Sequence, residues 1–136
     1  MAKFVLKDAV VTINGTDLSD HFSECTIEGT ADSVDTTGFT TASFRTFLPG
    51  FKEATITLTA FQDFAASSLD SVLYPMWNNS TDGTVKVRET TSSTIYWTMI
   101  GKLLTYSPIA GAVGDAATTP VQFVNSSTAG LTRGTS

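Results

Sequence analysis

Residues 53–61 alternate between apolar and polar side chains along nearly their whole length. The apolar positions are Ala54, Ile56, Leu58 and Ala60. The polar positions between them are threonines: Thr55, Thr57 and Thr59. Because successive side chains of a β-strand point to opposite faces, this pattern predicts a half-buried strand. We expect the apolar face to lie on the core, and the alternation leaves open what the threonine face meets.

The same pattern predicts further strands at residues 9–13, 22–29, 84–89, 95–106 and 118–124. Turn-forming residues separate them, such as Asn14-Gly15, which accepts the positive φ of a tight hairpin turn. One helix is expected between residues 63 and 74, where apolar residues recur at helical spacing. Asp63 or Ser67 can cap its start, and Pro75 is expected to end it at about Tyr74.

Residues 35–50 form the least regular stretch of the chain. They carry four large apolar side chains: Phe39, Phe44, Phe47 and Leu48. A loop of this length inside a compact domain is uncommon and often functional. Two interpretations stay open, since these side chains either fold back on the core as a hairpin or are buried against another subunit. The last residues, 125–136, contain little that could order them, so neighbours are expected to hold them.

The composition is low in charge and high in hydroxyl groups. Charged residues make up 15% of the 136 residues, whereas about 25% is usual. Serine and threonine together number 38, a bias typical of strands and turns. A chain of this length forms one domain.

Net charge and the lack of apolar runs bear on partners and location. The net charge of −5 argues against holding nucleic acid by neutralising its phosphates. Lys86 and Arg88 share one face of a predicted strand and are interpreted as an interface or solvated pair. No segment approaches the roughly 20 apolar residues of a membrane span, and residues 1–8 lack the apolar run of a signal peptide. We therefore expect synthesis in the cytoplasm and no membrane partner.

Residues that carry catalytic chemistry are scarce. Cys25 is the only cysteine, which excludes an intramolecular disulfide and any multi-cysteine metal site. His21, beside Asp20 and Glu24, is the only histidine and is interpreted as a turn residue. A serine or cysteine nucleophile would need His21 as its base, and no Gly-x-Ser-x-Gly turn is present. We expect no enzyme, no catalytic residue, no cofactor and no metal site.

Four stretches, in order along the chain, resemble one family. They are residues 8–21, residues 48–52 with the alternating strand that follows, residues 61–77, and residues 106–115. The second reads Leu48-Pro49-Gly50-Phe51-Lys52 and the fourth Tyr106-Ser107-Pro108-Ile109-Ala110-Gly111-Ala112-Val113-Gly114-Asp115. The chain resembles the major tail proteins, or tail tube proteins, of long flexible-tailed bacteriophages (siphoviruses), especially those infecting actinobacteria. The match spans nearly the whole chain.

The resemblance implies a mainly β fold, an antiparallel β-sandwich or partial barrel with one flanking α-helix, in a single tail tube domain over residues 1–136. It implies hexameric rings stacked into a tail tube, a conduit for genome delivery. A long loop at about 35–50 and a C-terminal arm at about 125–136 would reach adjacent rings. Residues expected at contacts between subunits are Phe39, Phe44, Arg45, Phe47 and Leu48. Residues expected to face the lumen or a neighbour are Thr55, Thr57 and Thr59.

The implied partners are further copies of the chain and, at the tube ends, other tail proteins, while DNA passes without specific binding. The implied location is the virion, after synthesis in the host cytoplasm. A capsid decoration protein or a carbohydrate-binding β-sandwich also fits the composition, with Trp77, Trp97, Tyr96 and Tyr106 as a candidate aromatic platform. A tail terminator or a secretion-system tube protein of the same fold is a further alternative.

Overall fold

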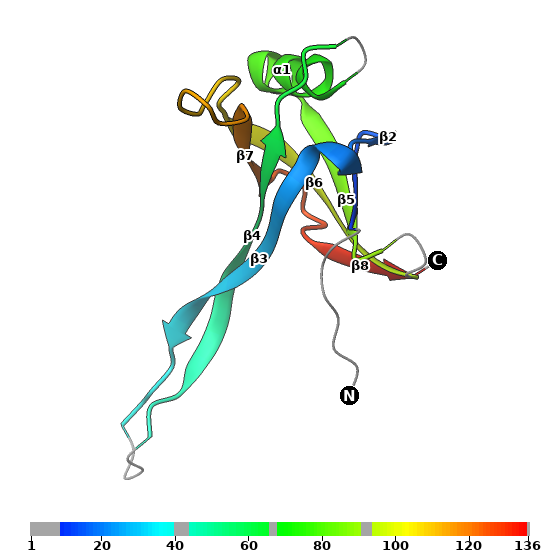
Figure 1. Ribbon diagram of the computed structural model, residues 1–136. Helices are drawn as coiled ribbons and strands as arrows, with labels where there is room; N and C mark the ends of the chain where they lie inside the picture. The colour runs from blue at the N-terminus through cyan, green and yellow to red at the C-terminus, as the bar shows by residue number, and fades with distance from the viewer. Residues whose placement is uncertain (1–8, 40–43, 66–67, 91–93, 136) are drawn as a thin grey trace.

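The computed structural model describes residues 9–39, 44–65, 68–90 and 94–135. Within these residues the fold consists of eight strands, one 3₁₀ helix and one α-helix (Figure 1). In chain order they are β1 (Val10–Ile13), β2 (Thr16–Asp17), η1 (Ser19–His21), β3 (Phe22–Asp35), β4 (Phe47–Phe61), α1 (Leu69–Asn79), β5 (Asp82–Arg88), β6 (Ile95–Tyr106), β7 (Thr118–Asn125) and β8 (Thr132–Thr135). The fold is mainly β, as the sequence predicts.

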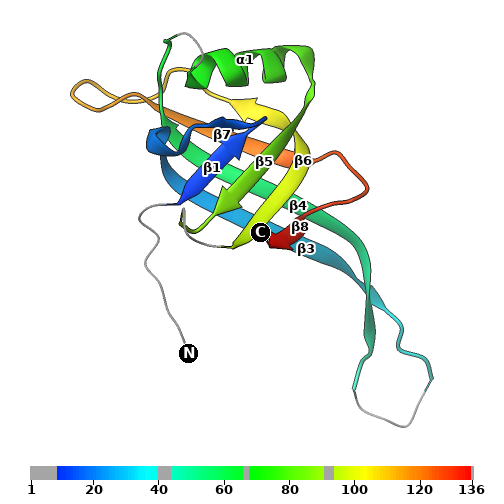
Figure 2. The same ribbon diagram turned by 90° about the vertical axis from the view of Figure 1, so that its right-hand side faces the viewer.

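The strands form one antiparallel sheet in the order β2-β1-β5-β6-β7-β4-β3, and β8 pairs with the first part of β6. The sheet is open and bends on itself, so that β1 and β5 lie in front of β3 and β4 in Figure 2. Val11 and Val85 from one half of the sheet, and Ile56 and Leu58 from the other, belong to one buried core. The predicted antiparallel, single-domain fold with one flanking helix is confirmed.

The alternation in β4 is explained by its two neighbours in the sheet. Leu58 lies opposite Cys25 of β3 on one side and opposite Val121 of β7 on the other. Residues directly opposite one another in antiparallel strands point to the same face, so such rows form layers of the core. The four apolar positions are all buried, as predicted: Ala54, Ile56, Leu58 and Ala60.

Helix α1 covers one end of the bent sheet (Figures 1 and 2). Its buried residues are Leu69, Leu73 and Met76. The prediction that Pro75 ends the helix at about Tyr74 is wrong, because Pro75 lies inside a helix that continues to Asn79. Burial of Met76 holds the turn after the proline on the core, and Ser80 ends the helix in the left-handed conformation at φ 52°. Tertiary packing here outweighs the hydrogen bond that proline removes.

β3 and β4 extend beyond the rest of the sheet as a long hairpin (Figures 1 and 2). β7 pairs with β4 only from Thr55 to Phe61, whereas β3 pairs with β4 as far as Asp35 and Phe47. The predicted loop at 35–50 is therefore shorter than expected, since residues 47–50 belong to β4. Pro49 fits in this strand because, among the described residues, β4 has a partner strand on one side only there.

The C-terminal residues return to the sheet. In β8, Gly134 lies opposite Tyr96 of β6, and Leu131 packs against the core. The ring of Tyr96 lies over this glycine: a Cβ on Gly134 would lie 2.2 Å from Cζ of Tyr96, so a larger residue there would displace the ring. The predicted C-terminal arm at 125–136 is thus, over its described part, attached to its own chain. Its reach to neighbouring subunits stays a prediction.

Candidate inter-subunit surfaces

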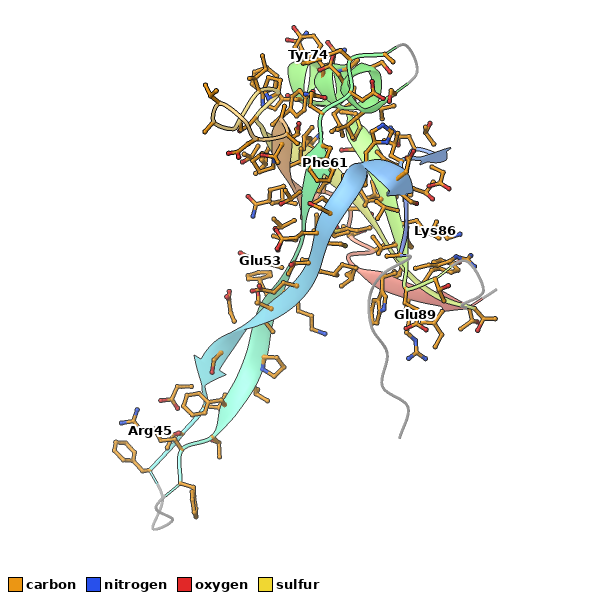
Figure 3. All side chains as sticks on the ribbon, in the orientation of Figure 1. Arg45, Glu53, Phe61, Tyr74, Lys86 and Glu89 are labelled. Carbon is orange, nitrogen blue, oxygen red and sulfur yellow. The ribbon has the colours of Figure 1, made fainter. Side chains whose placement is uncertain are left out.

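The far part of the β3–β4 hairpin, residues 31–39 and 44–52, is here called the arm. It carries apolar side chains that the described residues leave uncovered. Phe39 is 112% exposed and Phe44 83% exposed, and Phe47 and Leu48 are exposed as well. Figure 3 shows Arg45 at the far end of the arm, away from the sheet. The interpretation that these apolar side chains fold back on the core is therefore wrong. Their contact with another subunit stays a prediction.

Hydrogen bonds keep the arm ordered up to its tip. The N–H of Thr36 donates to the carbonyl oxygen of Thr46 at 2.8 Å, and the N–H of Thr46 donates to Oγ1 of Thr37 at 2.8 Å. Hydrogen bonds from Thr37 to the carboxylate of Asp35 lower the pKa of Asp35. Phe51, 87% exposed, is a further aromatic side chain of the arm. Its exposure was not predictable from the sequence, because its neighbours have the composition of a turn.

Thr55, Thr57 and Thr59 belong to a larger polar surface, here called the threonine face, made by the outer side of β3, β4 and β7. Opposite these threonines on β3 are Glu28, Thr26 and Glu24. Opposite them on β7 are Val124, Gln122 and Pro120. Within residues 22–30, 53–61 and 118–125 the charged residues are all acidic: Glu24, Glu28 and Glu53. Glu53 shares the face of the threonines by the alternation of the strand itself. Only the strand register brings Glu24 and Glu28 of β3 to the threonines, so sequence alone could not find those two.

A polar cluster connects η1 to the segment before α1. Nε2 of His21 lies 3.0 Å from Oδ2 of Asp63 and 3.2 Å from Oγ of Ser68. Nδ1 lies 2.9 Å from Oδ1 of Asp20, within ion-pair distance but without the angle of a hydrogen bond. The hydrogen bond to Asp63 raises the pKa of His21. Hydrogen bonds from Ser68 and His21 lower the pKa of Asp63 to about 2.

The same cluster corrects the predicted helix start. The N-cap residue of α1 is Ser68, and the carboxylate of Asp63 instead accepts hydrogen bonds from Ser68, His21 and the N–H of Ala65. The other candidate cap, Ser67, lies outside the described residues. The chain before α1 is therefore attached to η1 through the contact between Asp63 and His21.

The arrangement of Asp20, His21 and Ser68 superficially follows the order of a Ser-His-Asp triad. The hydroxyl of Ser68, however, donates its proton to Oδ2 of Asp63 at 2.7 Å, so it has none left for His21. The raised pKa of His21 favours the imidazolium, which cannot accept a proton. Ser68 is also buried. The cluster therefore acts as a structural connection and not as a nucleophile with its base.

The β6–β7 loop, residues 107–117, is held at both of its stems by Gln62. The N–H of Gln62 donates to the carbonyl oxygen of Ala117 at 3.1 Å, and its Nε2 donates to the carbonyl oxygen of Pro108 at 2.7 Å. Nε2 also donates to Oη of Tyr106 at 3.2 Å, and that hydroxyl donates to Asp70 of α1. Burial and the hydrogen bond to Asp70 raise the pKa of Tyr106 to about 12. The loop, the end of β4 and α1 are thereby joined.

Lys86 and Arg88 share the outer side of β5, as predicted, and both contact one aromatic ring. Nζ of Lys86 lies 4.1 Å from the centroid of the Tyr96 ring, and Cζ of Arg88 lies 5.3 Å from it. Both distances are in the range of cation–π contacts. The two cations lie in the half of the sheet that does not carry the threonine face, so they add no positive charge to that face.

Over the described ranges, no group of three or more His, Cys, Asp or Glu side chains is placed to hold a metal ion. The helices of the same ranges include none that is long and apolar enough to cross a membrane.

Comparison with known proteins identifies the fold. No protein-family model and no curated protein matches the sequence. A chain of the virion of a native gene transfer agent particle matches with a TM-score of 0.75 and 14% identity, over 93% of this chain and 95% of that one. A chain of the tail of an empty gene transfer agent particle with C6 symmetry matches with a TM-score of 0.71 and 15% identity, over 87% and 86% of the two chains.

A third solved structure, the tube-terminating cap of the anti-feeding prophage, matches with a TM-score of 0.67 and 13% identity, over 100% of this chain and 95% of that one. At such low identity these likenesses establish the fold and nothing further. They extend over nearly the whole of each chain. This protein therefore has a fold that also occurs in the tails and tubes of phage-like particles.

Proposed function

We propose that this chain is a tail tube protein of a bacteriophage or a related particle. Six copies form a ring, and rings stack into a tube through which DNA passes. The protein is structural and not an enzyme, it is located in the virion, and its partners are further copies and the tail proteins at the tube ends. The finer assignment, to the major tail protein of a siphovirus of actinobacteria, rests on the four sequence stretches that resemble that family.

The arm is the observation that carries this proposal. Large apolar side chains gathered on one exposed segment of a soluble protein favour contact with another molecule. Phe39, Phe44 and Phe51 leave water only if another subunit covers them. The edge strand β3, which pairs with β4 alone among the described strands, offers unpaired backbone groups that a neighbouring copy would satisfy. Head-to-tail contacts that close make a ring, and one structure of this fold comes from a tail with C6 symmetry.

The threonine face is assigned to the lumen rather than to a neighbouring subunit. DNA binds proteins chiefly where lysine and arginine neutralise its phosphates. On β3, β4 and β7 this face offers DNA hydroxyls, an amide, the apolar Val124 and Pro120 and the carboxylates of Glu24, Glu28 and Glu53. Lys102 of β6 borders the face opposite Val124, and its ammonium group is paired with Asp82 at 3.0 Å. In a subunit interface those carboxylates would need cationic partners to avoid repulsion. Across a lumen filled with water and salt, charges more than about 10 Å apart are largely screened. A wall of this kind repels phosphates and lets DNA slide.

Electron microscopy of the concentrated purified protein tests this function. Long hollow tubes are the expected result. Single rings that never stack would favour the second candidate, a tube terminator, which is considered because a tube-terminating cap matches over 100% of this chain. A protein that remains monomeric would overturn both assignments and favour a decoration or carbohydrate-binding module.

A further inference from the structure

Lys86 and Arg88 are two cations to which the proposed tube gives no role. They lie on the outer side of β5 and line a hollow of about 450 Å³. The other residues that line this hollow are Val10, Thr12, Gly15 and Thr84. From Val85 to Arg88, β5 is paired with β1 on one side and with β6 on the other, so its backbone groups are used within the sheet. A molecule in the hollow therefore meets chiefly side chains, among them two cations and two hydroxyls.

The two cations are held in place by one aromatic ring. Nζ of Lys86 lies 4.1 Å and Cζ of Arg88 lies 5.3 Å from the centroid of the Tyr96 ring, so both contact the ring and its attraction offsets the repulsion between them. The ring itself lies over Gly134 of β8. Side chains that are ordered in this way lose little conformational freedom when another molecule binds, which favours binding.

The carboxylates nearest to the hollow have partners within the chain. Asp17 of β2, which pairs with β1, accepts hydrogen bonds from the N–H and the hydroxyl of Ser19. Asp82 of β5 lies 3.0 Å from Nζ of Lys102. Glu89 follows β5 and does not line the hollow. The charged side chains that line the hollow are therefore both positive, and they are complementary to an anionic group.

The shape and place of the hollow indicate the kind of anion. Residues 84–88 span about 14 Å along a strand, so the hollow suits an extended ligand. A peptide commonly binds a sheet by adding a strand at a free edge, and β5 is not an edge strand. Duplex DNA carries about one charge per 1.7 Å, and the net charge of −5 repels a polymer of that charge density. A polysaccharide with widely spaced anionic groups avoids both difficulties.

We propose that the hollow on β5 binds an acidic polysaccharide, with an anionic group at Lys86 and Arg88 and sugar hydroxyls at Thr12 and Thr84. This activity goes beyond the proposed tube. The core lies between the two halves of the bent sheet, so their outer sides point away from each other, and Figure 3 shows Lys86 on the side of the molecule away from Glu53. In a tube lined by the threonine face the hollow lies outside, where repeated sites would bind one polymer with high avidity.

Isothermal titration calorimetry of the purified protein tests this site. The probes are alginate, which carries carboxylates, dextran phosphate, which carries phosphates, and neutral dextran. We expect binding of at least one acidic probe, which identifies the anionic group, and no binding of dextran. The affinity should decrease as salt increases. Lys86→Gln combined with Arg88→Gln should weaken binding at least about tenfold, as the loss of hydrogen bonds to charged groups does. Thr12→Val, which keeps the shape of the side chain, should weaken it several-fold.

The control variant removes the same charge from the arm, by Arg45→Gln combined with Lys52→Gln at two exposed positions. It should bind like the wild type, and circular dichroism should show the same fold for both double variants. An equal loss in the control would mean that net charge and not the hollow holds the polymer. That result, no binding of either acidic probe, equal binding of dextran, or equally tight binding of duplex DNA would overturn the proposal. Since the binding is measured per chain, this outcome is independent of whether tubes form.

Discussion

Strand β4 crosses two regions with opposite properties. Between Ala54 and Ala60 its apolar side chains are buried, because β3, β7, α1 and the other half of the sheet surround them. Between Phe47 and Phe51, in the same strand, the aromatic side chains are exposed, because within the described residues β3 alone pairs with β4 there. The comparison shows that hydrophobic content alone does not define a core. Apolar residues in the first region stabilise the subunit, and those in the second lie outside its core.

The largest expected effect comes from a cavity in the first region. Leu58→Ala should lower the free energy of unfolding by about 2–5 kcal/mol, as large-to-small changes at fully buried positions do. The matched change in the second region, Phe51→Ala, should alter it by less than about 0.5 kcal/mol, since an exposed side chain contributes little to a monomer. Urea unfolding of both variants measures this difference. A Leu58→Ala protein that melts like the wild type would contradict the burial of Leu58.

Removing the tip of the arm should separate folding from assembly. Deletion of residues 39–47 is expected to leave a folded subunit, because the core lies outside the arm. That subunit should not stack into tubes. Circular dichroism reports the fold and electron microscopy the assembly. Tubes of normal length from this deletion would remove the arm from any role in stacking.

The cluster around His21 and Asp63 should make stability depend on pH. The pKa of His21 is raised above 6.5, so its stabilising contribution is complete below pH 6.5 and is lost as the pH rises through the raised value. The pKa of Asp63 falls from 3.8 to about 2, so its contribution is present above pH 3.8 and is lost as the pH falls towards 2. Both contributions are complete between pH 3.8 and pH 6.5.

Thermal unfolding of the wild type and of Asp63→Asn across this range measures the effect. The melting temperature of the wild type should exceed that of the variant most between pH 3.8 and pH 6.5. This difference in melting temperature should become smaller below and above that range. A difference that stays constant from acid to alkaline pH would mean that the ion pair is not its source.

The smallest effect on the subunit is expected on the threonine face. Thr57→Lys places a cation there, and the free energy of unfolding should change by less than about 0.5 kcal/mol. The tubes should nevertheless gain an affinity for DNA that decreases as salt increases. Ser71→Lys, at an exposed position of α1, is the matched control and should not retain DNA. Equal retention by both variants would contradict the assignment of the threonine face to the lumen.

Local patterns predicted the parts of the fold that local residues determine. The alternation around Leu58 marks a strand with one buried face wherever the strand lies, and the spacing of Leu69, Leu73 and Met76 marks a helix. The start of β4 at Phe47 was not predictable, because Leu48-Pro49-Gly50 has the composition of a turn and becomes a strand only through pairing with β3. β8 has no apolar alternation and is defined by its register with β6.

The candidate surfaces likewise divide into residues that a local pattern identifies and residues that only the folded structure brings together. Phe39, Phe44 and Leu48 were identifiable because apolar side chains in an irregular segment are conspicuous in a sequence. Glu24 and Glu28 beside the threonine face were not identifiable, because only the register of β3 against β4 brings them there. The prediction that Pro75 ends the helix was wrong for a related reason. The local signal of the proline was outweighed by the burial of Met76.

The β3–β4 ladder has a mechanical consequence. Its hydrogen bonds run perpendicular to the strands, and the pairing continues from the core into the arm with one shift of register between Ala31 and Ser33. A pull along the arm therefore strains many of these bonds together in shear instead of opening them one after another. A bending tube would transmit tension from subunit to subunit through this ladder. The same hairpin that leaves Phe51 exposed would then act as a tether whose strength comes from the subunit's own sheet.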